Sequence, residues 1–155
     1  MNIRRFKEED ASKVSSIIER CFKERDVGGH TERGRCLQIK HNRPEILIKR
    51  AKTTKYFVAM VDDAVVGICG YGDGEVRTLF VDVDRQGQGF GKALLTEVLT
   101  DAEKNGVTDL STWSTFYAEK LYYSFGFKRK REIFLPEGCQ DIILIEMNKA
   151  LGETL

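Results

Sequence analysis

The sequence contains little proline and no long apolar run, and both absences narrow what the protein can be. Only two prolines occur among 155 residues, and no stretch has low complexity, so we expect a folded chain without disordered tails. No window approaches the roughly 18 uninterrupted apolar residues that a membrane-spanning helix needs, so we expect no membrane partner. Residues 1–10 contain no apolar signal core, which makes the cytoplasm the expected location.

The sequence also has no large excess of positive or negative charge. The chain carries 25 Lys and Arg residues against 24 Asp and Glu residues, which gives a formal net charge of +1 at pH 7. Domains that bind nucleic acids usually present a strongly basic surface. The sequence therefore predicts a protein without a nucleic-acid partner.

Patterns typical of metal sites and disulfides are missing as well. The four cysteines are Cys21, Cys36, Cys69 and Cys139, and their spacing gives neither a C-x-x-C pair nor another zinc-ligand pattern. Cys21 and Cys69 lie among apolar residues, where a free cysteine behaves as a small core side chain. We expect no metal, and no disulfides because the expected compartment is reducing.

What the sequence does contain is enough apolar residues for one domain, expected over residues 1–155. Hydrophobic residues make up 41% of the chain. Hydrophobic periodicity predicts antiparallel strands first, and then a strand–helix–strand–helix segment that can hold a parallel pair. The expected strands are Ile3–Phe6, Tyr56–Val61, Ala64–Tyr71, Glu75–Val83, Thr108–Trp113, Lys128–Phe134 and Asp141–Lys149. The expected helices are Glu8–Phe22, Pro44–Ala51, Gly87–Lys104 and Tyr117–Phe125, with a polar loop at 23–43 that holds at most one short helix.

The most distinctive feature is a strand that runs into three glycines, Gly87, Gly89 and Gly91, at the start of a helix. Glycine lets the backbone approach a ligand closely, and a helix N-terminus carries a partial positive charge. The segment is therefore either a simple turn or an anion site suited to a pyrophosphate. It is not a nucleotide P-loop, because Ala93 stands where Ser or Thr should follow Lys92.

Two motifs together resemble those of the GNAT superfamily of N-acetyltransferases. Gln86-x-x-Gly89-x-Gly91 is similar to the acetyl-CoA loop of that superfamily, Q/R-x-x-G-x-G/A. The segment Ala118–Phe127 is similar to its A-x-x-L/F-Y-x-x-x-G-F helix. The order of the elements also agrees over nearly the whole chain, while the specific resemblance covers residues 75–127.

The resemblance implies a fold, an activity and a co-substrate. The implied fold is α/β (α+β), with a mixed, mostly antiparallel sheet of about seven strands flanked by about four helices. The implied activity is transfer of an acetyl group from acetyl-CoA to a primary amine of a small molecule, peptide or protein, by direct attack in a ternary complex. The alternatives are a catalytically silent module of this fold that binds or senses CoA, and a nucleotide-binding α/β domain. The implied partner is an amine-bearing acceptor, and a homodimer stays an open alternative to a monomer.

The resemblance also assigns the residues that bind CoA. The strand before the loop implies backbone contacts from Leu79, Phe80 and Val81 to the pantetheine arm and the thioester carbonyl. Many members carry Asn where this chain has Thr115, so a polar contact from Thr115 to CoA stays open. The other implied CoA-binding residues are Arg85, Gln86, Gly87, Gln88, Gly89, Phe90, Gly91, Lys92 and Tyr122.

Tyr122 is the candidate general acid that protonates the leaving thiolate, because it occupies the position of the tyrosine in the GNAT helix motif that Ala118–Phe127 resembles. Spacing alone favours a core aromatic with a hydrogen-bonded hydroxyl, since Tyr122 shares the apolar helix face with Leu121 and Phe125. Tyr123 points elsewhere on the helix and is the poorer candidate. Both interpretations of Tyr122 stay open at this point.

Glu75 is the candidate base that removes a proton from the amine, through water. Strict alternation would place Glu75 on the same strand face as Leu79 and Val81. The alternative is an exposed Glu75 paired with Arg77, with Asp73 or water as the base. Residues that fall in acceptor-side regions without a specific signal are His30, His41 and Cys139.

One segment departs from the even charge balance. Lys23–Lys55 holds ten Lys and Arg residues against four Asp and Glu residues. This segment is either a solvated helical surface or a rim that attracts an anionic acceptor or the phosphates of CoA.

Overall fold

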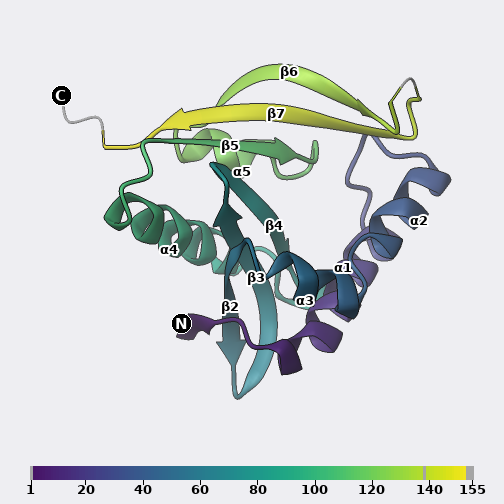
Figure 1. The fold of residues 1–155 in the computed structure, drawn as a ribbon. Helices are drawn as coiled ribbons and strands as arrows, with labels where there is room; N and C mark the ends of the chain where they lie inside the picture. The colour runs from purple at the N-terminus through teal and green to yellow at the C-terminus, as the bar shows by residue number, and fades with distance from the viewer. Residues whose placement is uncertain (1, 138, 153–155) are drawn as a thin grey trace.

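The chain forms one seven-stranded sheet with helices on both faces (Figure 1). The computed structural model describes residues 2–137 and 139–152. Within these residues the strands are β1 (Asn2–Arg5), β2 (Lys55–Val61), β3 (Ala64–Gly72), β4 (Glu75–Val81), β5 (Asp109–Ser114), β6 (Lys128–Leu135) and β7 (Ile142–Ala150). The helices described are α1 (Ala11–Glu24), α2 (Glu32–Lys40), α3 (Pro44–Arg50), α4 (Phe90–Lys104) and α5 (Glu119–Ser124), with short 3-10 helices η1 (Glu8–Asp10) and η2 (Val83–Arg85).

The strand order in the sheet is β1-β2-β3-β4-β5-β7-β6. Every neighbouring pair is antiparallel except β4 and β5, which are parallel. The connection between these two strands runs through α4, as a parallel pair requires. The predicted mixed, mostly antiparallel sheet of seven strands is therefore confirmed.

Helix α2 lies inside the segment for which the sequence predicted a loop with at most one short helix. The Thr31 side chain accepts a hydrogen bond from the Gly34 backbone N–H at 3.0 Å, which caps the helix start. Gly34 is the helix's buried residue, so α2 has no apolar stripe for periodicity to detect. The described part of the chain thus holds five α-helices instead of about four, and none of them is long and apolar enough to cross a membrane.

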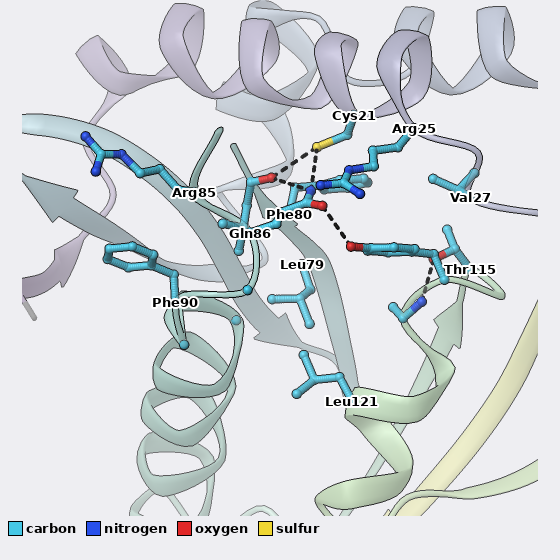
Figure 2. Close-up of a pocket in the computed structure, with 16 residues that line it drawn as sticks. Cys21, Arg25, Val27, Leu79, Phe80, Arg85, Gln86, Phe90, Thr115 and Leu121 are labelled. Carbon is cyan, nitrogen blue, oxygen red and sulfur yellow. Dashed lines mark hydrogen bonds between the residues drawn. The ribbon is translucent and has the colours of Figure 1, made fainter. Parts of the chain in front are cut away.

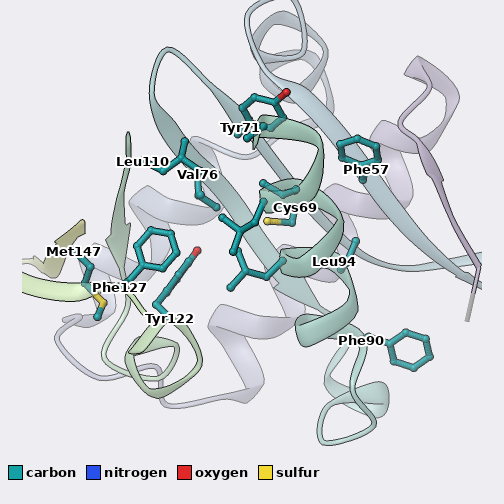
Figure 3. Packing of buried hydrophobic residues seen from close by; sticks show 14 of the residues in the cluster. Phe57, Cys69, Tyr71, Val76, Phe90, Leu94, Leu110, Tyr122, Phe127 and Met147 are labelled. Carbon is teal, nitrogen blue, oxygen red and sulfur yellow. The ribbon is translucent and has the colours of Figure 1, made fainter. Parts of the chain in front are cut away.

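Two hydrophobic clusters cover the two faces of the sheet. The cluster under α4 and α5 contains Leu94, Tyr122 and Cys69, as Figure 3 shows. The cluster under α1 and α3 contains Cys21 and Leu47. Cys21 and Cys69 are free and buried, as the sequence predicted. Burial of each large aliphatic side chain such as Leu94, which is 0% exposed, contributes about 1.5–3 kcal/mol to folding.

Two predicted helices have different boundaries in the structure. The predicted helix Gly87–Lys104 begins at Phe90, because Gly87 and Gly89 have φ values of 78° and 90° in the left-handed region. The predicted helix Tyr117–Phe125 is shortened to Glu119–Ser124. Its end is set by Gly126, whose φ is 91°.

The sheet splits between β4 and β5. The first two residues of β4 pair with the middle of β5, where Glu75 faces Ser111 and Val76 faces Thr112. Beyond Val76 the backbone of β4 bulges at Thr78, a non-glycine residue with φ of 61°. The end of β4, from Leu79 to Val81, therefore has no paired partner on its β5 side, and a gap opens there in the middle of the sheet.

Candidate functional site

Two cavities lie in the split between β4 and β5. The first has a volume of about 180 Å³ and extends to the glycine loop before α4. The second has a volume of about 320 Å³ and extends toward the α2–α3 connection and the start of β4. The residues that line both cavities are Leu79, Phe80, Thr115 and Ala118. A molecule in the first cavity and a molecule in the second would therefore meet at the end of β4.

Most of the predicted CoA-binding residues line the first cavity (Figure 2). Those in its wall are Leu79, Phe80, Val81, Arg85, Gln86, Gly87, Gly89, Phe90, Gly91 and Thr115. Gln88 and Lys92 are exposed and lie outside the wall, and Tyr122 lines the second cavity instead. The structure thus gathers the strand end and the loop around one space, as the sequence predicted from their order.

The glycine loop has the geometry of a cradle for a phosphate group. Gly89 precedes α4 with φ of 90° and ψ of 4°, a conformation that strains any residue with a Cβ. A Cβ on Gly91 would lie 3.2 Å from Cδ2 of Leu121, so a side chain there would intrude on the cavity. The backbone N–H groups of the first turn of α4 have no partner within the helix, and they favour an anion.

Gln86 crosses the mouth of the first cavity. Its Nε2 donates a hydrogen bond to the backbone oxygen of Val81 at 3.0 Å, and its Oε1 accepts one from the Tyr117 hydroxyl at 2.8 Å (Figure 2). The Cys21 thiol donates to the same Val81 oxygen at 3.2 Å, and burial raises the pKa of that thiol to about 12. Cys21 is therefore a neutral hydrogen-bond donor at the cavity wall rather than a nucleophile.

Sequence reasoning missed several residues of the first cavity. They are Cys21, Arg25, Val27, Tyr117 and Leu121. Cys21 and Val27 come from α1 and the segment after it, which lie more than 50 residues before the loop in the sequence. Of these residues, Tyr117 is the one that the sequence could have indicated, because it directly precedes the motif that begins at Ala118.

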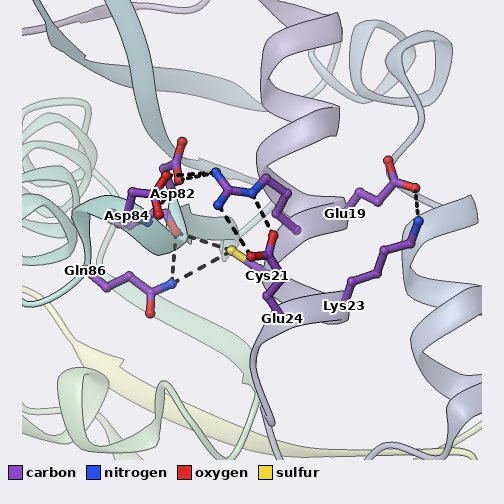
Figure 4. A network of polar contacts seen from close by, with 9 residues as sticks. Glu19, Cys21, Lys23, Glu24, Asp82, Asp84 and Gln86 are labelled. Atoms are coloured by element: carbon purple, nitrogen blue, oxygen red, sulfur yellow. Dashed lines mark hydrogen bonds and ion pairs between the residues drawn. The ribbon is translucent and has the colours of Figure 1, made fainter.

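An ion-pair network fixes the end of β4 and the loop against α1 (Figure 4). Arg20 of α1 donates to Asp82 at 3.0 Å, to Asp84 at 3.2 Å and to Glu24 at 2.7 Å. Asp82 is buried and also accepts a hydrogen bond from the Asp84 backbone N–H at 3.0 Å, which caps η2. Hydrogen bonds to Glu24 and Asp84 raise the pKa of Arg20 above its ordinary value.

The two predicted catalytic residues, Tyr122 and Glu75, line the second cavity together. Tyr122 is 3% exposed, and its ring packs edge-on against Phe127 with centroids 5.3 Å apart. Burial raises the pKa of Tyr122 well above its ordinary range, and the nearby Cys69 thiol adds to this effect. The hydroxyl of Tyr122 is therefore protonated at neutral pH.

Glu75 lies at the exposed start of β4. Its carboxylate accepts a hydrogen bond from Nε of Arg77 at 3.2 Å, and its side chain is 50% exposed. The expected alternation from Glu75 to Val81 is wrong, because the bulge at Thr78 interrupts it. Val76 packs in the same cluster as Leu79 and Val81, although even- and odd-numbered residues of a regular strand point to opposite faces. The alternation of side chains therefore shifts by one residue between Val76 and Leu79.

Other candidate residues have structural contacts of their own. The Thr115 hydroxyl accepts a hydrogen bond from the Ala118 backbone N–H at 3.2 Å, at the start of the turn that leads into α5. Nδ1 of His30 lies 2.8 Å from the Gly28 backbone oxygen, and burial lowers the pKa of its imidazole. Asp73 pairs with Arg77 at 3.5 Å. Cys139 is exposed and lines neither cavity, whereas His41 lines the second one.

A family model described as the acetyltransferase (GNAT) domain matches residues 32–151. The chain belongs to the GNAT acetyltransferase family. The match spans the glycine loop, the split in the sheet and most of the residues that line the two cavities, so the family resemblance predicted from the two motifs is confirmed. The protein is an acetyltransferase whose acetyl donor, in this family, is acetyl-CoA.

Solved GNAT structures share the fold over nearly the full chain. A GCN5-related N-acetyltransferase from Rhodopseudomonas palustris has a TM-score of 0.86 and 17% identity, with 97% of this chain and 95% of that chain covered. The PaiA N-acetyltransferase from Thermoplasma acidophilum, solved with coenzyme A, has a TM-score of 0.78 and 19% identity, with coverage of 96% and 98%. The yncA protein of Salmonella typhimurium, solved with acetyl-CoA, has a TM-score of 0.69 and 17% identity, with coverage of 100% and 96%. A search of curated protein sequences finds no match.

Proposed function

We propose that this GNAT protein transfers an acetyl group from acetyl-CoA to the primary amine of a small acceptor, by direct attack while both are bound. The observation that carries the proposal is the meeting of the two cavities at the end of β4. The donor occupies the first cavity, with its pyrophosphate at the start of α4 and its thioester beside Leu79 and Phe80. The acceptor occupies the second cavity and reaches the thioester from the opposite end.

The end of β4 supplies the groups that orient the donor. Because β5 does not pair with Leu79–Val81, backbone groups of Leu79 and Phe80 on that side are available to the pantetheine arm and the thioester carbonyl, whereas the Val81 oxygen is already bonded to Gln86 and Cys21. Donors fixed in a strand need no reorganisation when negative charge develops on the carbonyl oxygen, which makes them effective in catalysis. Thioesters are already activated, so the reaction needs no covalent enzyme intermediate.

Tyr122 and Glu75 are proposed to move the protons. The Tyr122 hydroxyl is protonated at neutral pH, so it has a hydrogen bond, and then a proton, to donate to a leaving thiolate. Glu75 faces the second cavity at its solvent-exposed end and can accept a proton from the arriving ammonium group through water. An amine of ordinary pKa, about 10.4, must lose a proton before it can attack.

A panel of primary amines tests the proposal. The purified protein is incubated with acetyl-CoA and each of a set of small amines, amino acids and peptides. We expect release of free thiol that depends on the amine, together with a product that is heavier by one acetyl group in mass spectrometry. If acetyl-CoA binds but no amine in the panel is acetylated, the protein is instead a module that binds CoA without turnover.

A further inference from the structure

The second cavity holds a positive charge that has no carboxylate partner among the described residues. Arg50, the last residue of α3, is half-buried in the cavity wall. Its Nη1 donates to Oδ1 of Asn42 at 2.9 Å and to Oγ1 of Thr78 at 3.2 Å. Its Nη2 donates to the His41 backbone oxygen at 2.8 Å. All three acceptors are neutral, so they orient the guanidinium without balancing its charge.

Two other partly buried arginines have carboxylate partners, whereas Arg35 and Arg85 have none among the described residues. Arg77, which lines the same cavity, pairs with Glu75 at 3.2 Å and with Asp73 at 3.5 Å. Arg4 pairs with Asp10 at 2.8 Å. A guanidinium held in a partly desolvated wall without a counter-charge is costly, and an anion that binds to it recovers part of that cost.

The cavity as a whole carries one uncompensated positive charge. Its charged lining residues are Arg50, Arg77 and Glu75, which gives two positive charges and one negative charge with His41 neutral. Glu75 is already paired with Arg77, so the surplus charge is on Arg50. Arg50 also contacts Thr78, which comes directly before the Leu79–Phe80 segment that lines both cavities. Arg50 therefore contacts the residue that comes directly before the junction of the two cavities.

We infer that the acceptor is an amino-acid-type molecule, which carries a carboxylate as well as the amine that is acetylated. Arg50 binds the carboxylate, and the amine extends to the junction at Leu79. A planar guanidinium fits a carboxylate because it can present two parallel N–H donors. The cavity volume of about 320 Å³ suits a small molecule of this kind. This inference rests on the proposed function, since it names the acceptor class of the same site.

A purely structural role for Arg50 predicts different behaviour. Arg50 joins the α2–α3 connection to the bulge of β4, so its removal could loosen the cavity for every acceptor alike. Recognition of a carboxylate predicts a loss only for acceptors that carry one. The comparison must therefore be made between matched pairs of amines, in which each amino acid is paired with its neutral primary amide.

The test measures kcat/KM for a panel of amino acids, including β- and γ-amino acids, and for their neutral amides. Calorimetric titration of the same amino acids into the CoA-saturated protein gives a second readout that needs no turnover. The variants are Arg50→Gln, which removes the charge, Arg50→Lys, which keeps it, and Lys49→Gln, which removes an exposed neighbouring charge outside both cavities. The thermal unfolding midpoint without ligand checks that each variant folds.

We expect the wild type to prefer at least one amino acid over its amide by about 10–100-fold, the scale of a charge-assisted pair of hydrogen bonds. Arg50→Gln should abolish this preference through a higher KM with little change in kcat, Arg50→Lys should retain part of it, and Lys49→Gln should leave it intact. If amides are acetylated as well as amino acids, the inference is wrong although the proposed function stands. If no acceptor is acetylated but amino-acid binding depends on Arg50, the inference stands and the proposed transfer fails. If amino acids neither bind nor react while other amines are acetylated, the inference fails and the proposed function stands.

Discussion

At the scale of single residues, Tyr122 combines two roles that the sequence could not separate. Its ring belongs to the core cluster under α4 and α5, and the residue also lines the second cavity. In Figure 3 the ring lies beside Phe127, and the hydroxyl points toward the region of Cys69. A packing role and a proton-donor role are therefore compatible in this structure, and they differ only in what the hydroxyl does.

Tyr122→Phe separates these roles because it keeps the ring and removes the proton. If the hydroxyl protonates the leaving thiolate, kcat should fall by about 10²–10⁴-fold, while CoA affinity and the unfolding midpoint change little. The measurement is steady-state kinetics with an accepted amine, alongside calorimetric titration of CoA. Tyr123→Phe is the matched control, since Tyr123 is 72% exposed on the neighbouring position of α5. A folded Tyr122→Phe protein that turns over at the wild-type rate would show that water or the substrate is the acid.

At the level of residues, a motif in the sequence can indicate which positions lie together. The order and spacing of Gly89 and Gly91 single them out as candidate CoA-binding residues, and both lie in the wall of the first cavity, Gly89 before α4 and Gly91 in its first turn. Cys21 and Arg50 could not be assigned to a site in the same way. Each reaches its cavity from a distant helix, and only the tertiary packing of α1 and α3 against β4 brings it there.

At the scale of elements, α1 determines the position of the glycine loop. Arg20 of α1 reaches Asp82 and Asp84 around η2, and Asp82 caps η2 through the Asp84 backbone N–H. These contacts hold the end of β4 and the start of the loop in one arrangement before any ligand binds (Figure 4). A loop that is already ordered loses less conformational entropy when it binds a ligand.

Asp82→Ala should therefore weaken the binding of CoA. The substitution removes the cap of η2 and the buried carboxylate that anchors Arg20, a loss of about 0.5–2 kcal/mol for a cap of this kind. We expect the dissociation constant for CoA, measured by calorimetry, to rise by about 2–30-fold. Glu24→Ala is the control, because Glu24 contacts the same Arg20 from an exposed position outside the cavity. Equal CoA affinity in Asp82→Ala and the wild type would contradict the anchoring role.

The elements differ in how clearly the sequence specifies them. Helices α1 and α4 have apolar residues at helical spacing, and both were predicted with small boundary errors. Helix α2 was not defined, because its stability comes from the Thr31 cap and from contacts with α1 rather than from an apolar stripe. The alternation in β4 was mispredicted because a bulge at Thr78 changes the parity, and no residue pattern marks a bulge at a threonine.

At the scale of the whole molecule, the split in the sheet produces the site. Strands β1–β4 and β5–β7 form two groups joined by the short β4–β5 pairing at Glu75 and Val76 (Figure 1). On the far side of that pairing the strands separate, and helices α1, α4 and α5 supply the remaining walls of the first cavity. The predicted parallel pair is confirmed, but its early end could not be predicted, since it depends on how β5 pairs with β7.

The central claim is that the first cavity binds acetyl-CoA with its pyrophosphate on the glycine loop, and calorimetric titration of acetyl-CoA tests it most directly. The wild type should bind with a dissociation constant between about 1 μM and 1 mM, the range usual for enzyme substrates. Gly91→Val should lose this binding and remain folded, because a branched side chain at Gly91 intrudes on the space beside Leu121. Thr96→Val, at an exposed position of the same helix, should bind as the wild type does. No heat of binding to the wild type at millimolar acetyl-CoA, or unchanged binding to Gly91→Val, would contradict the account.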